Sequence, residues 1–152
     1  LVPRVGGFEG GTVTWAPTHM TYGHNNRSAM LRLPQSRFCI ENRAADMCMN
    51  PYLGLGITAA CLTEGVVNKL DPGRPLNQDL YALSEEEVAT SGAQRLPRHL
   101  LEAVETLRED SFVISTMGEQ MANSFIAYKV DEWERYHQAI TDWEVQEYLR
   151  LF

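Results

Sequence analysis

Two kinds of hydrophobic pattern follow one another along this chain, and their order constrains its fold more than any other feature. Residues 12–43 contain many β-branched and aromatic residues, which favour extended chain, whereas the strong patterns after Asn50 repeat with the period of a helix. The elements expected first are extended chain at 12–22, a turn at 23–26, and strands at 29–33 and 37–43. The two strands are joined by a short turn and should pair antiparallel. Strands followed only by helices predict an α+β fold, with a curved antiparallel sheet followed by packed helices.

Helix starts are marked by residues that satisfy free backbone amides. Asn50 followed by Pro51 predicts a helix that runs to about residue 70, where an Asp-Pro-Gly sequence ends it. Nearly all of its side chains are small or apolar, so we expect it to be buried behind the sheet, with its glycines allowing close approach. Later helices are expected from the capping box at Ser84, from Pro97, over 118–139, and from the capping box at Thr141. The helix at 118–139 should bury a stripe through Met121, Phe125, Tyr128, Glu132 and Tyr136.

The strand expected at 37–43 concentrates charge on one side. Its two-residue period places four side chains on one face: Arg37, Cys39, Glu41 and Arg43. Phe38 and Ile40 should point the other way, into a core. Arg32 of the neighbouring strand adds a further guanidinium to the charged face. Both a solvated sheet face and the floor of a binding pocket are consistent with this pattern.

Charge and cysteine content narrow the classes of partner. The 152 residues carry a formal net charge of −7, and the bases of residues 1–60 are all arginines. Guanidinium groups bind phosphate and carboxylate through two parallel hydrogen bonds. The acidity of the rest of the chain argues against a nucleic-acid partner. The longest uncharged stretch, 47–63, is too short and polar to span a membrane. Three cysteines without a paired motif indicate a reducing, cytoplasmic setting, with Cys39 and Cys61 expected to be buried.

Three sequence blocks together resemble one enzyme family. They are NRSAMLRLP at 26–34, RFCIENRAAD at 37–46 and NPYL at 50–53, and later blocks follow in the same order. They are similar to the C-terminal half of the glutamine synthetase catalytic domain, in the type III-like or γ-glutamylmethylamide synthetase-like branch. The resemblance implies an ATP-dependent ligase of nitrogen metabolism. ATP phosphorylates glutamate, and ammonia or a small alkylamine then displaces phosphate from γ-glutamyl phosphate.

The resemblance also assigns roles to individual residues. Arg27 would contact both nucleotide and glutamate, and Arg32 and Arg37 would bind the phosphates of ATP. Arg27 and Arg37 would be the catalytic arginines. Glu41 would ligate Mg²⁺ or Mn²⁺, and Arg43 would bind the glutamate substrate. In the full-length enzyme the family forms a ring-shaped homo-oligomer.

Several departures from the family pattern lead to further expectations. The family's N-terminal β domain and the first half of its catalytic domain have no counterpart in residues 1–152. We therefore expect a fragment that is inactive alone, because one carboxylate cannot hold a catalytic magnesium ion. Trp15 stands where ammonia-using members have a glutamate, which suits an alkylamine, although the indole could simply pack. Tyr81 lies where some members are adenylylated, and an unmodified loop tyrosine is the simpler alternative.

Two other functions remain open from the sequence. A family-like domain without catalysis could serve as an assembly or regulatory module. An unrelated domain could use the arginine face to bind anions. Retention of all five predicted site residues favours the ligase over the first alternative, and the family order of the blocks favours it over the second.

Overall fold

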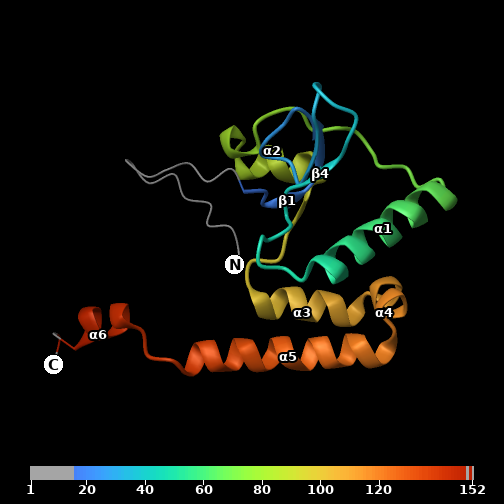
Figure 1. The fold of residues 1–152 in the computed structure, drawn as a ribbon. Helices are drawn as coiled ribbons and strands as arrows, with labels where there is room; N and C mark the ends of the chain where they lie inside the picture. Colours follow the sequence, from blue (N-terminus) through green and yellow to red (C-terminus); the bar gives the residue numbers. More distant parts are fainter. Residues whose placement is uncertain (1–15, 150, 152) are drawn as a thin grey trace. The chain divides into compact units, whose positions relative to one another are not determined.

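The computed structural model describes residues 16–149 and 151 and has an α+β fold, as predicted (Figure 1). It divides into two compact units, one ending at Pro97 and the other beginning at Arg98. The elements of the first unit are β1 (His19–Met20), β2 (Tyr22–His24), β3 (Leu31–Leu33), β4 (Glu41–Asn42), α1 (Pro51–Val67), the short 3-10 helix η1 (Leu80–Ala82), α2 (Glu85–Thr90) and β5 (Gln94–Arg95). Those of the second are α3 (Leu100–Glu109), α4 (Ser111–Met117), α5 (Glu119–Gln138) and α6 (Asp142–Tyr148).

The strands of the first unit form two small sheets. In the larger sheet β3 lies between β2 and β4, and β3 pairs antiparallel with β4, as predicted. By contrast, β2 pairs parallel with β3, so the sheet is mixed. The expected turn at 23–26 begins later, because Gly23 and His24 belong to β2 and Asn25 takes the left-handed conformation, with φ 51°. The smaller sheet pairs β1 with β5 antiparallel.

The strand predicted at 37–43 is confined to Glu41 and Asn42. Successive side chains point to opposite faces only where the chain is hydrogen-bonded as a strand of a sheet. The residues directly before Glu41 are not part of a strand. Phe38 is fully exposed and Ile40 is 51% exposed, so the prediction that they enter a core is wrong. Cys39 and Cys61 are also exposed, contrary to expectation.

Helix α1 begins as predicted but is not buried. The Asn50 side chain accepts hydrogen bonds from the amides of Tyr52 and Leu53, at 3.0 and 3.3 Å. The helix ends at Val67, slightly before the predicted stop. No residue of α1 is buried, so the expected burial behind the sheet is wrong for the part of the unit that the structure describes. A helix that is apolar all round can be buried only where other elements cover each of its faces.

The second unit is built around the packing of α3 against α5, which lie side by side in Figure 1. Helix α3 begins at Leu100, later than the predicted Pro97. Among the described residues of this unit, those that are buried are Val104 of α3 and Ala122 and Ile126 of α5. The predicted stripe is wrong for Met121, Tyr128 and Tyr136, which are 52%, 60% and 67% exposed. A neighbouring stripe of the same helix faces α3 instead.

Both predicted capping boxes are present. Ser84 caps α2 with Glu87 as the reciprocal partner, and Thr141 caps α6 with Glu144. Among the described residues, no helix is long and apolar enough to cross a membrane.

Candidate functional site

Three of the predicted site residues form one ion-pair cluster. The antiparallel register of β3 and β4 places Arg32 directly opposite Glu41. Arg32 Nη1 donates to Glu41 Oε2 at 2.9 Å, and Arg37 Nη2 donates to Glu41 Oε1 at 2.5 Å. Each oxygen of the Glu41 carboxylate therefore accepts from a different guanidinium group. Arg37 reaches Glu41 from the loop between the strands.

The electrostatics of this cluster favour an anion. Hydrogen bonds from Arg37 and then from Arg32 hold the pKa of Glu41 below its usual 4.5. The cluster has two guanidinium groups and one carboxylate, so its net charge is +1. Arg32 Nε is buried and lacks a hydrogen-bond partner among the described residues. Guanidinium groups with remaining donors and excess charge suit phosphate or carboxylate ligands.

The other two predicted arginines, Arg27 and Arg43, are joined by a hydrogen bond. Arg43 Nε donates to the backbone carbonyl of Arg27 at 3.0 Å. Burial raises the pKa of the nearby Tyr81 hydroxyl. The positive charge of Arg43 acts on that pKa in the opposite direction but is the smaller effect. That hydroxyl donates to the carbonyl of Ala16. Adenylylation of Tyr81 would have to break this bond, which is consistent with the simpler expectation of an unmodified tyrosine.

Two asparagines, Asn25 and Asn26, lie beside the arginines. Both fall in the turn expected at 23–26, and Asn26 also begins the NRSAMLRLP block. Asn25 Oδ1 accepts from Arg32 Nη2 at 2.5 Å. Asn26 is buried, with 8% exposure, and hydrogen-bonds to a segment 50 positions further along the chain. The signal in the sequence was the run of polar residues directly around Arg27, which a simple turn does not require.

The described residues do not form a complete divalent-metal site. They contain no group of three histidine, cysteine, aspartate or glutamate side chains that could hold a metal ion. Glu41 could supply one ligand, but both of its oxygens pair with arginines. Mg²⁺ and Mn²⁺ require several oxygen ligands, so these residues alone do not fit the metal that the resemblance implies.

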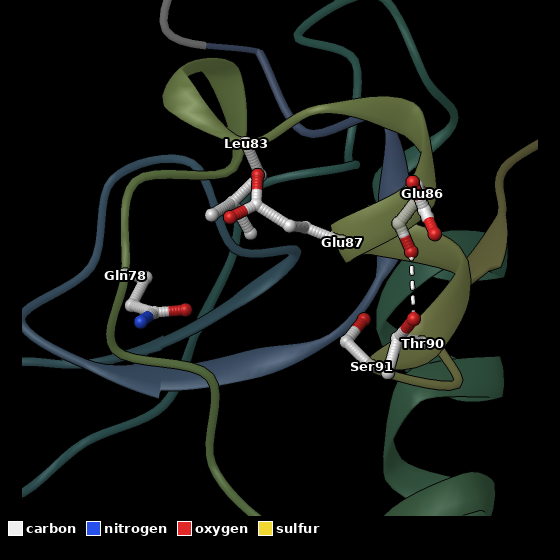
Figure 2. Close-up of a pocket in the computed structure, with 6 residues that line it drawn as sticks. All are labelled: Gln78, Leu83, Glu86, Glu87, Thr90 and Ser91. Atoms are coloured by element: carbon white, nitrogen blue, oxygen red, sulfur yellow. Dashed lines mark hydrogen bonds between the residues drawn. The ribbon is translucent and has the colours of Figure 1, made fainter.

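A separate open pocket of about 410 Å³ lies beside α2 (Figure 2). Its described lining consists of Gln78, Leu83, Glu86, Glu87, Thr90 and Ser91. The Thr90 hydroxyl donates to the backbone carbonyl of Glu86 at 2.8 Å, a bond internal to α2. None of the predicted site residues belongs to this lining, and its two carboxylates do not suit a phosphate. Trp15, the predicted determinant of the amine, lies outside the described residues.

Comparison with known proteins agrees with the sequence blocks. Residues 11–148 match the model of the glutamine synthetase catalytic domain. The glutamate–methylamine ligase of Methyloversatilis universalis is 40% identical over 139 residues, covering 91% of this chain and 31% of that relative. A glutamine synthetase of Methanococcus voltae is 33% identical over 90% of this chain and 31% of its own length. A solved GmaS–ADP complex superposes with a TM-score of 0.77 at 34% identity, covering 90% of this chain and 30% of that chain.

The family match and the structural superposition therefore define part of a glutamine synthetase-type catalytic domain. The chain belongs to the glutamine synthetase family and corresponds to the C-terminal half of its catalytic domain. The chain spans about 31% of the length of these curated relatives. Membership excludes the alternative of an unrelated anion-binding domain.

Proposed function

We propose that this chain forms the arginine-bearing part of an ATP-dependent ligase that joins glutamate to ammonia or a small amine. The observation that carries the proposal is the cluster of Arg32, Glu41 and Arg37, beside the contact of Arg43 with Arg27, inside a family catalytic domain. Phosphoryl transfer needs cationic groups around the phosphates. Arg32 and Arg37 bind the ATP phosphates, Arg27 contacts nucleotide and glutamate, and Arg43 binds glutamate.

The metal and the rest of the site are proposed to come from other parts of the assembled enzyme. Glu41 would supply one ligand to Mg²⁺ or Mn²⁺ in exchange for one of its arginine partners, and the metal, when bound, would screen the phosphate charge. Further ligands would come from the part of the family's catalytic domain that has no counterpart in these 152 residues. On this proposal the 152 residues alone would be inactive, and the full-length enzyme would be a ring-shaped homo-oligomer.

For the amine, we favour methylamine over ammonia. One relative is a glutamate–methylamine ligase, and it is 40% identical to this chain, compared with 33% for the glutamine synthetase of Methanococcus voltae. Trp15, in place of a glutamate, offers an aromatic face but no base for an ammonium ion. Trp15→Glu should therefore shift the preference toward ammonia by up to about thirtyfold, since such a contact contributes roughly 0.5–2 kcal/mol.

A chimera tests the proposal. This chain replaces the matching segment of the Methyloversatilis universalis ligase, and amine-dependent phosphate release is measured with ammonia, methylamine and ethylamine in competition. We expect turnover with a preference for methylamine. Arg32→Gln should lower turnover about a hundredfold, because it removes a cationic contact to the phosphates. Arg74→Gln is the matched control, since Arg74 is exposed in a loop outside the cluster. Equal activity of the two variants would contradict the proposal.

A further inference from the structure

The side-chain amide of Asn26 has four hydrogen bonds in a buried position. Its Nδ2 donates to the backbone carbonyls of Leu76 and Gln78, at 2.7 and 2.9 Å. Its Oδ1 accepts from the amide and the hydroxyl of Ser28, at 2.9 and 2.7 Å. An asparagine side chain has two donor hydrogens and two acceptor lone pairs, so every one of them is used.

Ser28 extends this network to a second point of the distant segment. Its side chain is almost completely buried, with 1% exposure for the residue, and Oγ accepts from the amide of Leu80 at 2.9 Å. The loop at 25–28 is thus held at three places along residues 76–80. Buried polar groups that are all satisfied rigidify the backbone around them, because any shift leaves one unpaired.

Arg27 lies between the two anchored residues. Its backbone cannot shift without breaking bonds of Asn26 or Ser28, and its carbonyl is the acceptor for Arg43 Nε at 3.0 Å. The place of the Arg43 guanidinium therefore depends on the place of that carbonyl. The hydrogen bond from Arg43 Nε to the Arg27 carbonyl thus connects Arg43 to the network of Asn26 and Ser28.

We propose that Asn26 is a positioning residue, which fixes the Arg27 carbonyl and through it the guanidinium of Arg43. What those arginines bind rests on the proposed function, but the positioning itself does not. An asparagine is required because two carbonyl oxygens face Nδ2, and only a donor can satisfy both. An aspartate has the same shape and cannot donate when ionised.

The experiment compares Asn26→Asp with the wild-type chain by NMR of the arginine Nε–H groups. We expect the Nε–H of Arg43 to exchange with solvent at least tenfold faster in Asn26→Asp, because its acceptor is no longer held in place. Asn77→Asp is the matched control. It adds the same charge in the segment that Asn26 contacts, yet the Asn77 oxygen that accepts from the His24 amide at 2.8 Å is retained.

A pH series separates positioning from general destabilisation. Protonation of the introduced carboxyl gives back one donor, so the ratio of exchange rates between Asn26→Asp and wild type should fall as the pH falls. A ratio that stays level or rises on acidification would overturn the proposal, as would an unchanged Arg43 Nε–H in a folded Asn26→Asp. If that variant does not fold, Ser28→Ala replaces it. It removes only the Ser28 hydroxyl and should accelerate exchange about threefold, and no acceleration would again overturn the proposal.

A second measurement distinguishes this proposal from the proposed function. ADP is titrated into the wild-type chain and into Asn26→Asp, and binding is measured. Fast Arg43 exchange in the variant supports the positioning role whether or not ADP binds. Absence of ADP binding by the folded wild-type chain, together with a chimera that shows no turnover, would count against the proposed function alone.

Discussion

The substitution Gly23→Ala probes the closest approach between β2 and the segment at 76–80. A Cβ at this position would lie 2.2 Å from the carbonyl oxygen of Leu76 and 2.9 Å from Cβ of Asn26. The Leu76 carbonyl cannot simply turn away. It accepts from Asn26 Nδ2, and the Leu76 amide donates to the carbonyl of Tyr22 at 2.8 Å. Relief therefore requires that β2 or the segment moves and breaks these bonds.

The expected loss follows from these contacts. Overpacking of this kind destabilises by about 1–3 kcal/mol, and each broken hydrogen bond adds about 1 kcal/mol. We expect Gly23→Ala to destabilise the first unit by about 2–4 kcal/mol, a large part of the stability of a small domain. Hydrogen exchange of the Leu31 amide, which donates to the carbonyl of Thr21 at 3.0 Å, reports on this unit.

Gly65→Ala is the matched control for the same assay. Apart from its chain neighbours and the adjacent backbone of the helix, no described residue has an atom within 4 Å of the position its Cβ would take, and Gly65 is in the interior of α1. Alanine there should stabilise the helix by about 0.5–1 kcal/mol, because it reduces the entropy lost on folding. A Leu31 amide that exchanges as slowly in Gly23→Ala as in Gly65→Ala would refute the close approach at Gly23.

Three other predictions concern packing and pH. Ile126→Ala should destabilise the second unit by about 2–4 kcal/mol and Met121→Ala by less than about 1 kcal/mol, since Ile126 is 7% exposed and Met121 is 52% exposed. Equal midpoints in thermal unfolding would contradict this. In a carbon-detected NMR titration the Glu41 carboxyl should have a midpoint below pH 4.5. Its ion pairs therefore stabilise the folded first unit above pH 4.5, and this stabilisation is lost as the pH falls through the lowered pKa. A midpoint at or above 4.5 would be against the arginine cluster. The pKa of His19 is lowered by burial and then by Arg95, so the unfolded chain takes up its proton first. Acidification through pH 6.5 should therefore destabilise the β1–β5 sheet, as measured by amide exchange at Leu96.

Local signals were sufficient for the features that depend on a few adjacent residues. The caps at Asn50, Ser84 and Thr141 act within one helical turn, so the sequence predicted these helix starts correctly. The antiparallel pairing of β3 and β4 followed from two extended segments and a short turn, and it brought Arg32 to Glu41. The sequence blocks also determined the family, because several motifs recur in order along most of the chain.

Burial and side-chain direction were decided only by the tertiary structure. Phe38 lies in an alternating pattern between Arg37 and Cys39, but it is outside the strand ladder and is exposed. Periodicity showed that α5 has an apolar face but could not show which stripe meets α3, and that stripe contains Ala122 and Ile126. The sequence placed Asn26 in a turn. It could not show the hydrogen-bond partners of the side chain, Leu76 and Gln78, because they lie 50 and 52 positions away. A residue's own neighbours in the sequence determine its backbone preference, whereas its function in positioning Arg27 depends on contacts that only the folded chain brings together.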